Sequence, residues 1–591
     1  MEKIKTFFKK PLIWIAFASL IFSYLIHFKT DVNFQNMVFS DGSGYYAYLP
    51  AFFLQKDASY EKTMKMQESY GEGKQNFSYA IKSKEGKIIN KYFPGLAIMQ
   101  LPAFASASLI LYCFDKPLTG YSTTYLLFFY LSSLCYVIIG IYFFLKSLNL
   151  YKERNGIEKK KVTWISFICI FFGTNLFFST LAYPSFSHIY SFFLFSLLIY
   201  NFQKYLCEER SRRLLFLGFI LGFIFLVRPT NILFVFFLPY FFSSFSELKK
   251  FVLKFFSFKK TSFLFILVPF LCIASTILFL NKWQTNEYFY WSYQGEGFNF
   301  LNPKFFETLF SYRIGIFVHN PILIICLIGL IFIYKENKYK FFAWLFYFLF
   351  ITYFISTWWC WDYESSFGHR GFSEHFLIFC FPMMYLFKIL GRNKLLIILI
   401  SSAILYIMMR FYQRIEGIFP RQKFTQETFW KSFFDFDTKI QGKYLNSSHC
   451  VPFGKIVKIT NIIPKQRAFN FNQAQEFAFD AHFDFPQDRL NNRFFLEVTF
   501  KKKIAKNNDW TDILVVSDSY STKDSSRYYF PLSIYNYYKE GDGEWIETIC
   551  QDEIPVCFAQ KDFCSIYMWN KNRKKFQVKD FEIKMYEYAT K

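Results

Sequence analysis

The chain has 591 residues, of which 53% are hydrophobic, 24% are aromatic and 87 are phenylalanine. A soluble globular protein of this length does not need so many large apolar side chains, so the composition excludes an ordinary soluble protein. The net charge of +24 would suit a nucleic-acid partner. However, the lysines and arginines cluster in short loops between apolar segments, where they act as orientation signals, and we expect no nucleic-acid binding.

Apolar segments recur as far as Phe411, and each is about long enough to cross the ~30 Å hydrocarbon core of a bilayer. This pattern predicts a polytopic α-helical membrane protein. We expect eleven transmembrane helices, at roughly 11–27, 123–146, 163–181, 186–202, 214–228, 231–246, 263–281, 314–334, 341–357, 373–390 and 395–411.

One further apolar segment, 93–113, contains Pro94, Pro102 and several small residues. The positive-inside rule places every basic connector in the cytoplasm only if this segment does not cross the membrane. We therefore predict a re-entrant or interfacial hairpin at 93–113, with the N-terminus inside and the C-terminus outside.

The first outer loop, 28–122, contains the sequence VFSDGSGYYAYLP. Asp41 is followed by three small residues and then by Tyr45 and Tyr46, which predicts a loop leading into an amphipathic helix at the membrane surface. Asp41 is either the N-cap of that helix or a functional carboxylate. Lys91, farther along the loop, is either a snorkelling lysine or a partner for a phosphate.

The outer loop between the expected spans 341–357 and 373–390 has the sequence WWCWDYESSFGHRGF. It brings Asp362, Glu364, His369 and Arg370 together between two spans. Part of this pattern is typical of an aromatic belt at a membrane interface. Because the arginine fork fits phosphate well and glycines flank the basic pair, we favour a binding function.

Other polar residues stand at the outer ends of spans. Arg228 ends an apolar span directly before Pro229, against the charge bias, and charged groups at such a depth usually pair or bind something. Similar outward positions are held by His188, Arg313 and His319. For each histidine an ordinary structural role is the alternative.

With these residues the chain resembles the GT-C superfamily of membrane glycosyltransferases, in particular the branch that contains the protein mannosyltransferases and the aminoarabinose transferase of lipid A. The resemblance covers roughly residues 11–411. It is carried by Asp41 in an early outer loop, by Lys91 with Pro94 before an interfacial helix, and by Trp358, Trp361 and the run from Ser366 to Arg370.

The resemblance implies an enzyme of the inner membrane that moves a sugar from a polyprenyl-phosphate donor to a lipid, glycan or protein acceptor on the outer face. It implies that Asp41 is the general base at the acceptor. It also implies that Lys91, Arg370 and Arg228 hold the donor phosphate, which fits the need for a base and for cations at the departing phosphate.

The chain departs from this family in two respects. Many members carry a second acidic residue in the short outer turn after the third span, where this chain has Ser187 and His188. No second carboxylate adjoins Asp41, so the paired form that would hold a divalent metal is absent, and we expect no certain cofactor.

The segment 412–440 is expected to be a helical or irregular connector, and 441–591 a soluble domain in the periplasm. In the latter, short alternating segments are separated by turn-rich stretches such as KNND and EGDG. This pattern predicts an all-β sandwich with a jelly-roll-like arrangement.

Two other functions remain open. A transporter or flippase for lipid-linked sugars would have a similar composition, although such proteins usually carry charges at mid-membrane. A glycan polymerase or ligase that acts on lipid pyrophosphates is also a transferase, and the sequence separates it poorly from the first reading.

Overall fold

The computed structural model describes residues 37–70, 77, 79–83, 87–159, 161–256, 262–293, 296–363, 367–416, 418, 426–436, 440–441, 456–466, 469–471, 476–484, 492–504, 513–520, 527–532, 537–538, 545–554, 563–570, 573 and 575–589. Contacts divide the chain into two compact units, Met1–Phe411 and Tyr412–Lys591.

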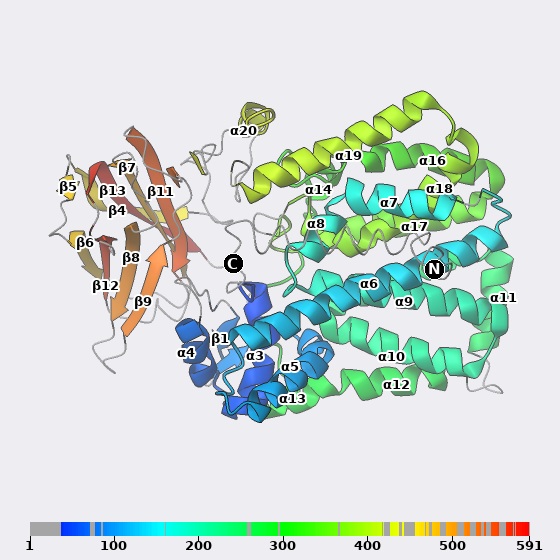
Figure 1. Cartoon of the computed structure of the whole chain (residues 1–591), viewed down its shortest axis with the longest axis horizontal. Coiled ribbons are helices and arrows are strands. Elements are labelled where there is room, and N and C mark those ends of the chain that lie inside the picture. Colours follow the sequence, from blue (N-terminus) through cyan, green and yellow to red (C-terminus); the bar gives the residue numbers. More distant parts are fainter. Residues whose placement is uncertain are drawn as a thin grey trace. The chain divides into compact units, whose positions relative to one another are not determined.

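The first unit is a helical bundle. Among its helices are α6 (Thr123–Arg154), α9 (Ser187–Glu208), α10 (Ser211–Val227), α12 (Leu264–Ala274), α16 (Ile322–Glu336), α17 (Lys338–Ser356), α18 (Cys380–Leu390) and α19 (Lys394–Ile415). Helix α9 packs between α6 and α10, and α10 packs in turn on α12 (Figure 1).

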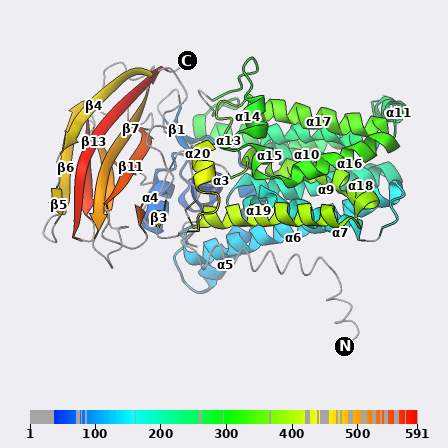
Figure 2. The same cartoon turned by 90° about the horizontal axis from the view of Figure 1, so that it is seen from above.

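The remaining elements of the first unit are α3 (Asp41–Pro50), η2 (Ala51–Gln55), α4 (Glu61–Tyr70), β1 (Ala80–Lys82), β2 (Ile88–Asn90), α5 (Gly95–Cys113), α7 (Val162–Gly173), α8 (Asn175–Leu181), η3 (Pro229–Phe241), α11 (Phe245–Phe255), α13 (Thr276–Thr285), α14 (Phe305–Phe310), α15 (Ile316–His319) and η4 (Arg370–Phe379). Figure 1 and Figure 2 show that α3, α4 and α5 gather at one end of the bundle and that α11 lies at the other.

Six stretches of helix in the described part of the chain are long and apolar enough to cross a membrane: Gly95–Cys113, Thr123–Arg154, Leu264–Thr285, Lys338–Ser356, Arg370–Leu390 and Lys394–Ile415. A seventh is counted if α7 and α8, which meet at 74°, form one bent span. These helices are those of a multi-pass membrane protein. The first expected span, 11–27, lies outside the described residues, and the count of eleven stays a prediction.

Local breaks explain why several expected spans are not single helices. At Thr174 the backbone turns to an extended conformation, and the Thr174 hydroxyl accepts a hydrogen bond from Leu176 N at 3.3 Å, so that α8 starts afresh after α7. Most of the expected span 231–246 lies in a 3₁₀ helix, Pro229–Phe241, that contains Pro239. Proline has no N–H to donate, which disfavours a regular α-helix there.

The prediction of a hairpin at 93–113 is wrong. Residues Gly95–Cys113 form one continuous helix of 19 residues, α5, with Pro102 inside it. Pro94 stands at the N-cap, where its missing N–H costs nothing. The apolar length of α5 is sufficient to cross a membrane, so the loop charges alone do not settle the path of the chain here.

The second unit contains the short helix α20 (Gln426–Lys431) and a set of antiparallel strands: β3 (Ile440–Gln441), β4 (Ile456–Gln466), β5 (Phe469–Phe471), β6 (Phe477–Asp484), β7 (Asn492–Ile504), β8 (Ile513–Tyr520), β9 (Arg527–Leu532), β10 (Tyr537–Tyr538), β11 (Trp545–Ile554), β12 (Phe563–Asn570) and β13 (Phe576–Ala589). One sheet has the order β11-β7-β13-β4, with β5 also on β13. The other has the order β6-β12-β8-β9.

Both sheets contribute to one apolar core. On β7 the alternate residues Leu496, Val498 and Phe500 are buried, as expected for a strand with one face inward. On β12 of the other sheet, Ile566 and Met568 belong to the same buried cluster. The prediction of β structure in the C-terminal domain is therefore confirmed.

Candidate functional site

The site begins at Asp41, which is the first residue of α3. Ser40 is the N-cap, and no side chain caps this helix. Instead, the Tyr92 hydroxyl donates to Asp41 Oδ1 at 2.7 Å, and Arg370 Nη2 lies 3.1 Å from Asp41 Oδ2. The N-cap alternative for Asp41 is therefore wrong, because both carboxylate oxygens point to other segments of the chain.

Electrostatics keep Asp41 ionised. Burial by itself raises the pKa of this carboxyl, but the Arg370 guanidinium and the Tyr92 hydroxyl outweigh that effect, and the pKa lies below its ordinary value. Lys91 and His188 are close enough to lower the pKa further. The structure thus brings four groups from distant segments around one carboxylate.

The sequence predicted that the helix after Asp41 lies at the membrane surface. This prediction is wrong, because α3 is buried. All residues from Gly42 to Pro50 are buried. The glycines permit this, since a Cβ added at Gly42 would lie 2.1 Å from Ser185 Oγ, and one at Gly44 would lie 2.2 Å from the Tyr92 ring. The DGSG sequence therefore serves close packing of a helix and does not form a loop.

Of the two adjacent tyrosines, only the first faces the site. The Tyr45 ring packs on the Tyr92 ring with centroids 4.8 Å apart. The Tyr46 hydroxyl donates to Gly120 O at 2.6 Å, and its ring packs edge-on against Phe129. Tyr46 therefore anchors α3 to the start of α6 and has a structural role.

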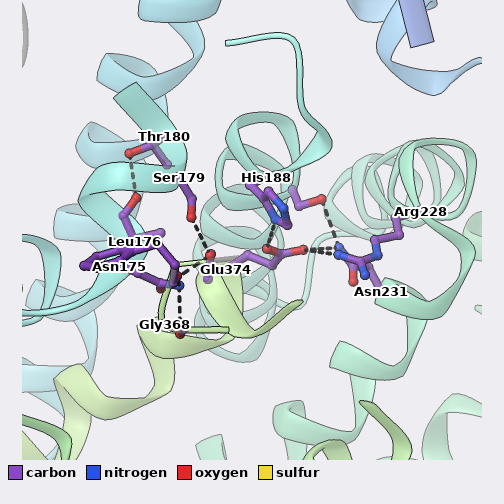
Figure 3. Close-up of polar contacts among 12 residues, drawn as sticks. Asn175, Leu176, Ser179, Thr180, His188, Arg228, Asn231, Gly368 and Glu374 are labelled. Carbon is purple, nitrogen blue, oxygen red and sulfur yellow. Dashed lines mark hydrogen bonds and ion pairs between the residues drawn. The ribbon is translucent and has the colours of Figure 1, made fainter. Parts of the chain in front are cut away.

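Arg370 is held by a loop with fixed geometry. Gly368 and His369 both have a positive φ, 58° and 65°. The Asn175 side chain donates to Phe367 O at 2.6 Å and to Gly368 O at 2.9 Å (Figure 3). Asn175 is the first residue of α8 and follows directly on the bend after α7. The start of α8 therefore holds the loop that presents Arg370.

His369 does not reach the site as a cation. It is fully buried, with its ring between Tyr363 and Phe372 at centroid distances of 5.5 and 5.2 Å. Burial, together with the nearby Arg228, lowers the pKa of His369 to about 3, so that its imidazole is neutral. The Arg370 guanidinium, by contrast, remains partly exposed and lies 5.2 Å from the Phe186 ring centroid.

Lys91 lies beside this group. Its Nζ is 2.8 Å from Glu296 Oε1 and lies over the rings of Tyr92 and Tyr293, at 5.4 and 5.9 Å. The Ser292 hydroxyl donates to Lys91 O at 2.7 Å. The loop after α13 therefore packs against the segment that carries Lys91 and supplies it with a carboxylate partner.

A second carboxylate, Glu374, organises the buried side of the site. Figure 3 shows it between His188 and the pair Asn231 and Arg228. Glu374 is fully buried. His188 Nδ1 lies 2.8 Å from Oε2, the Asn231 amide donates to Oε1 at 2.8 Å, and Arg228 Nη1 is 3.7 Å from Oε1. Asn231 also donates to Ser191 Oγ at 2.9 Å.

Arg228 connects the buried cluster to the partly exposed one. Its guanidinium lies 5.3 Å from the Tyr363 ring centroid, and 18% of its side chain is exposed. It can therefore reach a ligand while Glu374 holds its other side. This arrangement agrees with the expectation that Arg228 pairs with another group.

Sequence reasoning missed Glu374 because it lies inside the expected span 373–390. A carboxylate within such a segment is itself a signal, since buried charges in membrane spans are costly and usually functional. Tyr92 and Asn231 were missed as well. Neither residue type is distinctive by itself, and only the fold brings them to the two carboxylates.

The remaining candidates form another group. Arg313 Nη2 and Asp362 Oδ2 make an ion pair in which Asp362 is buried. His319 Nε2 bonds to Tyr312 O at 2.8 Å. This contact fits the alternative that His319 has an ordinary structural role. Glu364 lies outside the described residues.

Within the described ranges, no group of three or more His, Cys, Asp or Glu side chains is arranged to hold a metal ion. The site thus offers carboxylates, cations and tyrosines. Such a set can accept a proton at one point and bind an anion at another.

Comparison with known proteins gives no further guide to this chemistry. No protein-family model matches the chain, and no curated protein matches it in sequence.

Proposed function

We propose that the chain is a membrane glycosyltransferase that moves a sugar from a polyprenyl-phosphate donor to a hydroxyl or amine of a lipid, glycan or protein acceptor. The observation that supports it best is the meeting of Asp41 and Arg370 at 3.1 Å. A proton acceptor from the first outer loop and a phosphate-binding cation from the last one are adjacent, as transfer from a lipid phosphate requires.

In the proposed reaction the acceptor oxygen or nitrogen attacks the anomeric carbon and gives its proton to Asp41. The bond between that carbon and the phosphate oxygen breaks, and polyprenyl phosphate leaves with the electron pair. Arg370, Arg228 and Lys91 stabilise the negative charge on the departing phosphate. The products are the glycosylated acceptor and the carrier phosphate.

The ion pair between Arg370 and Asp41 implies an order of steps in the proposed reaction. Arg370 is bound to Asp41 Oδ2, and a donor phosphate competes with the carboxylate for the same guanidinium. When the phosphate takes Arg370, the Asp41 carboxylate becomes free to accept a proton. Donor binding before acceptor deprotonation follows from this competition.

The proposal includes a topology and a location. If α5 lies along the membrane surface and does not cross, eleven spans, with the N-terminus in the cytoplasm and the second unit in the periplasm of an inner membrane, agree with the positive-inside distribution of lysine and arginine. A jelly roll for the second unit is supported by the strand order. Apart from β5 and the adjacent pair β8 and β9, the strands of the orders β11-β7-β13-β4 and β6-β12-β8-β9 alternate between the two sheets along the chain, which is the connectivity of a jelly roll.

The test uses full-length protein in lipid nanodiscs with a panel of polyprenyl-phosphate sugars. Release of polyprenyl phosphate is measured by mass spectrometry, with Asp41→Asn as the inactive variant and Asp115→Asn as the matched control. Asp115 is an exposed carboxylate of the same outer loop. Movement of the intact donor between leaflets, with no release of carrier phosphate by the wild type, would favour the flippase alternative. Turnover of lipid pyrophosphates alone would favour the polymerase or ligase.

A further inference from the structure

Helix α11 is basic and amphipathic and lies at the end of the bundle away from the candidate site. Its sequence, FSELKKFVLKF, mixes large apolar residues with three lysines. Figure 1 shows it crossing the ends of the neighbouring helices, whereas the longer helices run along the bundle. No residue of α11 is buried.

The helix is nevertheless fixed in place. Phe251 packs against Phe242 and Phe202, with ring centroids 5.1 and 6.0 Å apart. Lys254 Nζ lies 2.5 Å from Glu209 Oε2, at the end of α9. These contacts hold one side of α11 against the bundle and determine which side faces outward.

The start of α11 is fixed as well. The Ser244 hydroxyl accepts a hydrogen bond from Glu247 N at 3.2 Å and caps the helix. The Asn337 side chain donates to Ser243 O at 2.9 Å, which ties this end to the turn between α16 and α17. The outward face of α11 is therefore a built surface and not the result of a loose end.

That face carries exposed apolar side chains. Phe245 is 68% exposed, Val252 41% and Phe256 61%. Their spacing of seven and four residues places them on one stripe of the helix. Leu253, at 63%, lies beside it. Water is a poor environment for such a stripe, whereas the boundary between head groups and acyl chains suits it.

Positive charge accompanies the stripe. Lys249 and Lys250 are exposed, and neither forms an ion pair with any residue that the structure describes. Lys254 is the only one of the three lysines with a carboxylate partner among those residues. The surface thus combines apolar contact area with two cations that have no counter-charge within the described part of the chain.

We propose that α11 is a binding surface for anionic phospholipid, with its apolar stripe at the acyl boundary of one leaflet and Lys249 and Lys250 on the head-group phosphates. Charge complementarity selects an anionic leaflet as the partner. The inference does not depend on the glycosyltransferase proposal. With the topology proposed above, the leaflet is the cytoplasmic one.

The first experiment measures depth. An environment-sensitive fluorophore is attached to a single cysteine at position 252 or at position 250, in full-length protein whose reactive cysteines are replaced by serine. Val252 and Lys250 lie on nearly opposite sides of the helix. In nanodiscs with brominated acyl chains, we expect about twofold stronger quenching at 252 than at 250, because only the former enters the acyl boundary. Equal quenching at the two positions would overturn the interfacial placement.

The second experiment measures lipid preference with the probe at 252. Quenching by brominated phosphatidylglycerol is compared with quenching by brominated phosphatidylcholine at the same mole fraction. We expect a preference for the anionic lipid of about fivefold per lysine, which the double variant Lys249→Gln/Lys250→Gln loses. The matched control, Lys62→Gln/Lys65→Gln on α4, should retain it. No preference in the wild type, or an unchanged preference in the α11 variant, would refute the anionic-lipid site.

Discussion

Replacement of Asp41 by asparagine separates a structural role from a chemical one. Asparagine has nearly the same size, and its amide oxygen can still accept the 2.7 Å hydrogen bond from Tyr92. The change removes the negative charge that faces Arg370 and the ability to take a proton. Of the two partners of Asp41, only the ion pair with Arg370 is therefore lost.

The structure indicates a small effect on stability and a large effect on turnover. The side chains of Asp41 and Arg370 are 25% and 23% exposed. An ion pair exposed to that extent contributes about 1 kcal/mol or less to the free energy of unfolding. Loss of a general base, by contrast, lowers the rate by ~10²–10⁴, which corresponds to about 3–5 kcal/mol in the activation barrier.

The assay follows carrier phosphate release under single-turnover conditions, with thermal unfolding and donor binding measured on the same preparations. We expect Asp41→Asn to unfold close to the wild type and to bind donor, yet to lose transfer by ~10²–10⁴. Asp115→Asn should behave as wild type. An Asp41→Asn protein that keeps activity within a few fold would refute the assignment of the base, and Asp362 and Glu364 would be the next carboxylates to test.

Three further predictions concern the neighbours of Asp41. Arg370→Gln should raise donor KM by ~10–100-fold through loss of a charged hydrogen bond; it should also raise the Asp41 pKa, because the strongest of the groups that oppose the effect of burial is then gone. Since Asp41 must be ionised to accept a proton, the acidic limb of the pH–rate profile should move to higher pH, and an unmoved limb would contradict the coupling. Glu374→Ala should lower the free energy of unfolding by ~3–5 kcal/mol, measured by thermal unfolding in detergent, because it leaves the partly buried Arg228 and two buried polar side chains without their carboxylate; Glu374→Gln should cost less. Gly42→Ala should cost ~1–3 kcal/mol by overpacking against Ser185, and Ser185→Gly in the same chain should restore most of it; no rescue would mean that the close approach is not the cause.

Local sequence patterns determined the character of the two units. Long apolar runs with little charge predict membrane helices because backbone groups in hydrocarbon must be satisfied within the segment. This logic holds for α6, α17 and α19. In the second unit, the alternation that buries Leu496, Val498 and Phe500 predicts a strand with one inward face.

Predictions from local sequence patterns failed where tertiary contacts decide the structure. The small residues after Asp41 were interpreted as a loop before a surface helix, but they allow α3 to approach Ser185 and Tyr92 and become buried. The segment 93–113 was interpreted as a hairpin on loop charge, yet its residues form the continuous helix α5. Neither close packing nor the path of a helix is encoded in hydropathy alone.

The candidate site was partly foreseen. Asp41, Lys91, Arg228 and Arg370 could be chosen from the sequence because charged residues next to apolar spans are unusual, although an N-cap or a snorkelling lysine was a local alternative for the first two. Glu374 could not be recognised as their partner, because the sequence gives no signal for which distant histidine, asparagine and arginine will surround it. Only the tertiary structure decides such pairings, since a buried charge is stable only where folding brings its counter-charges and hydrogen-bond partners within about 3 Å.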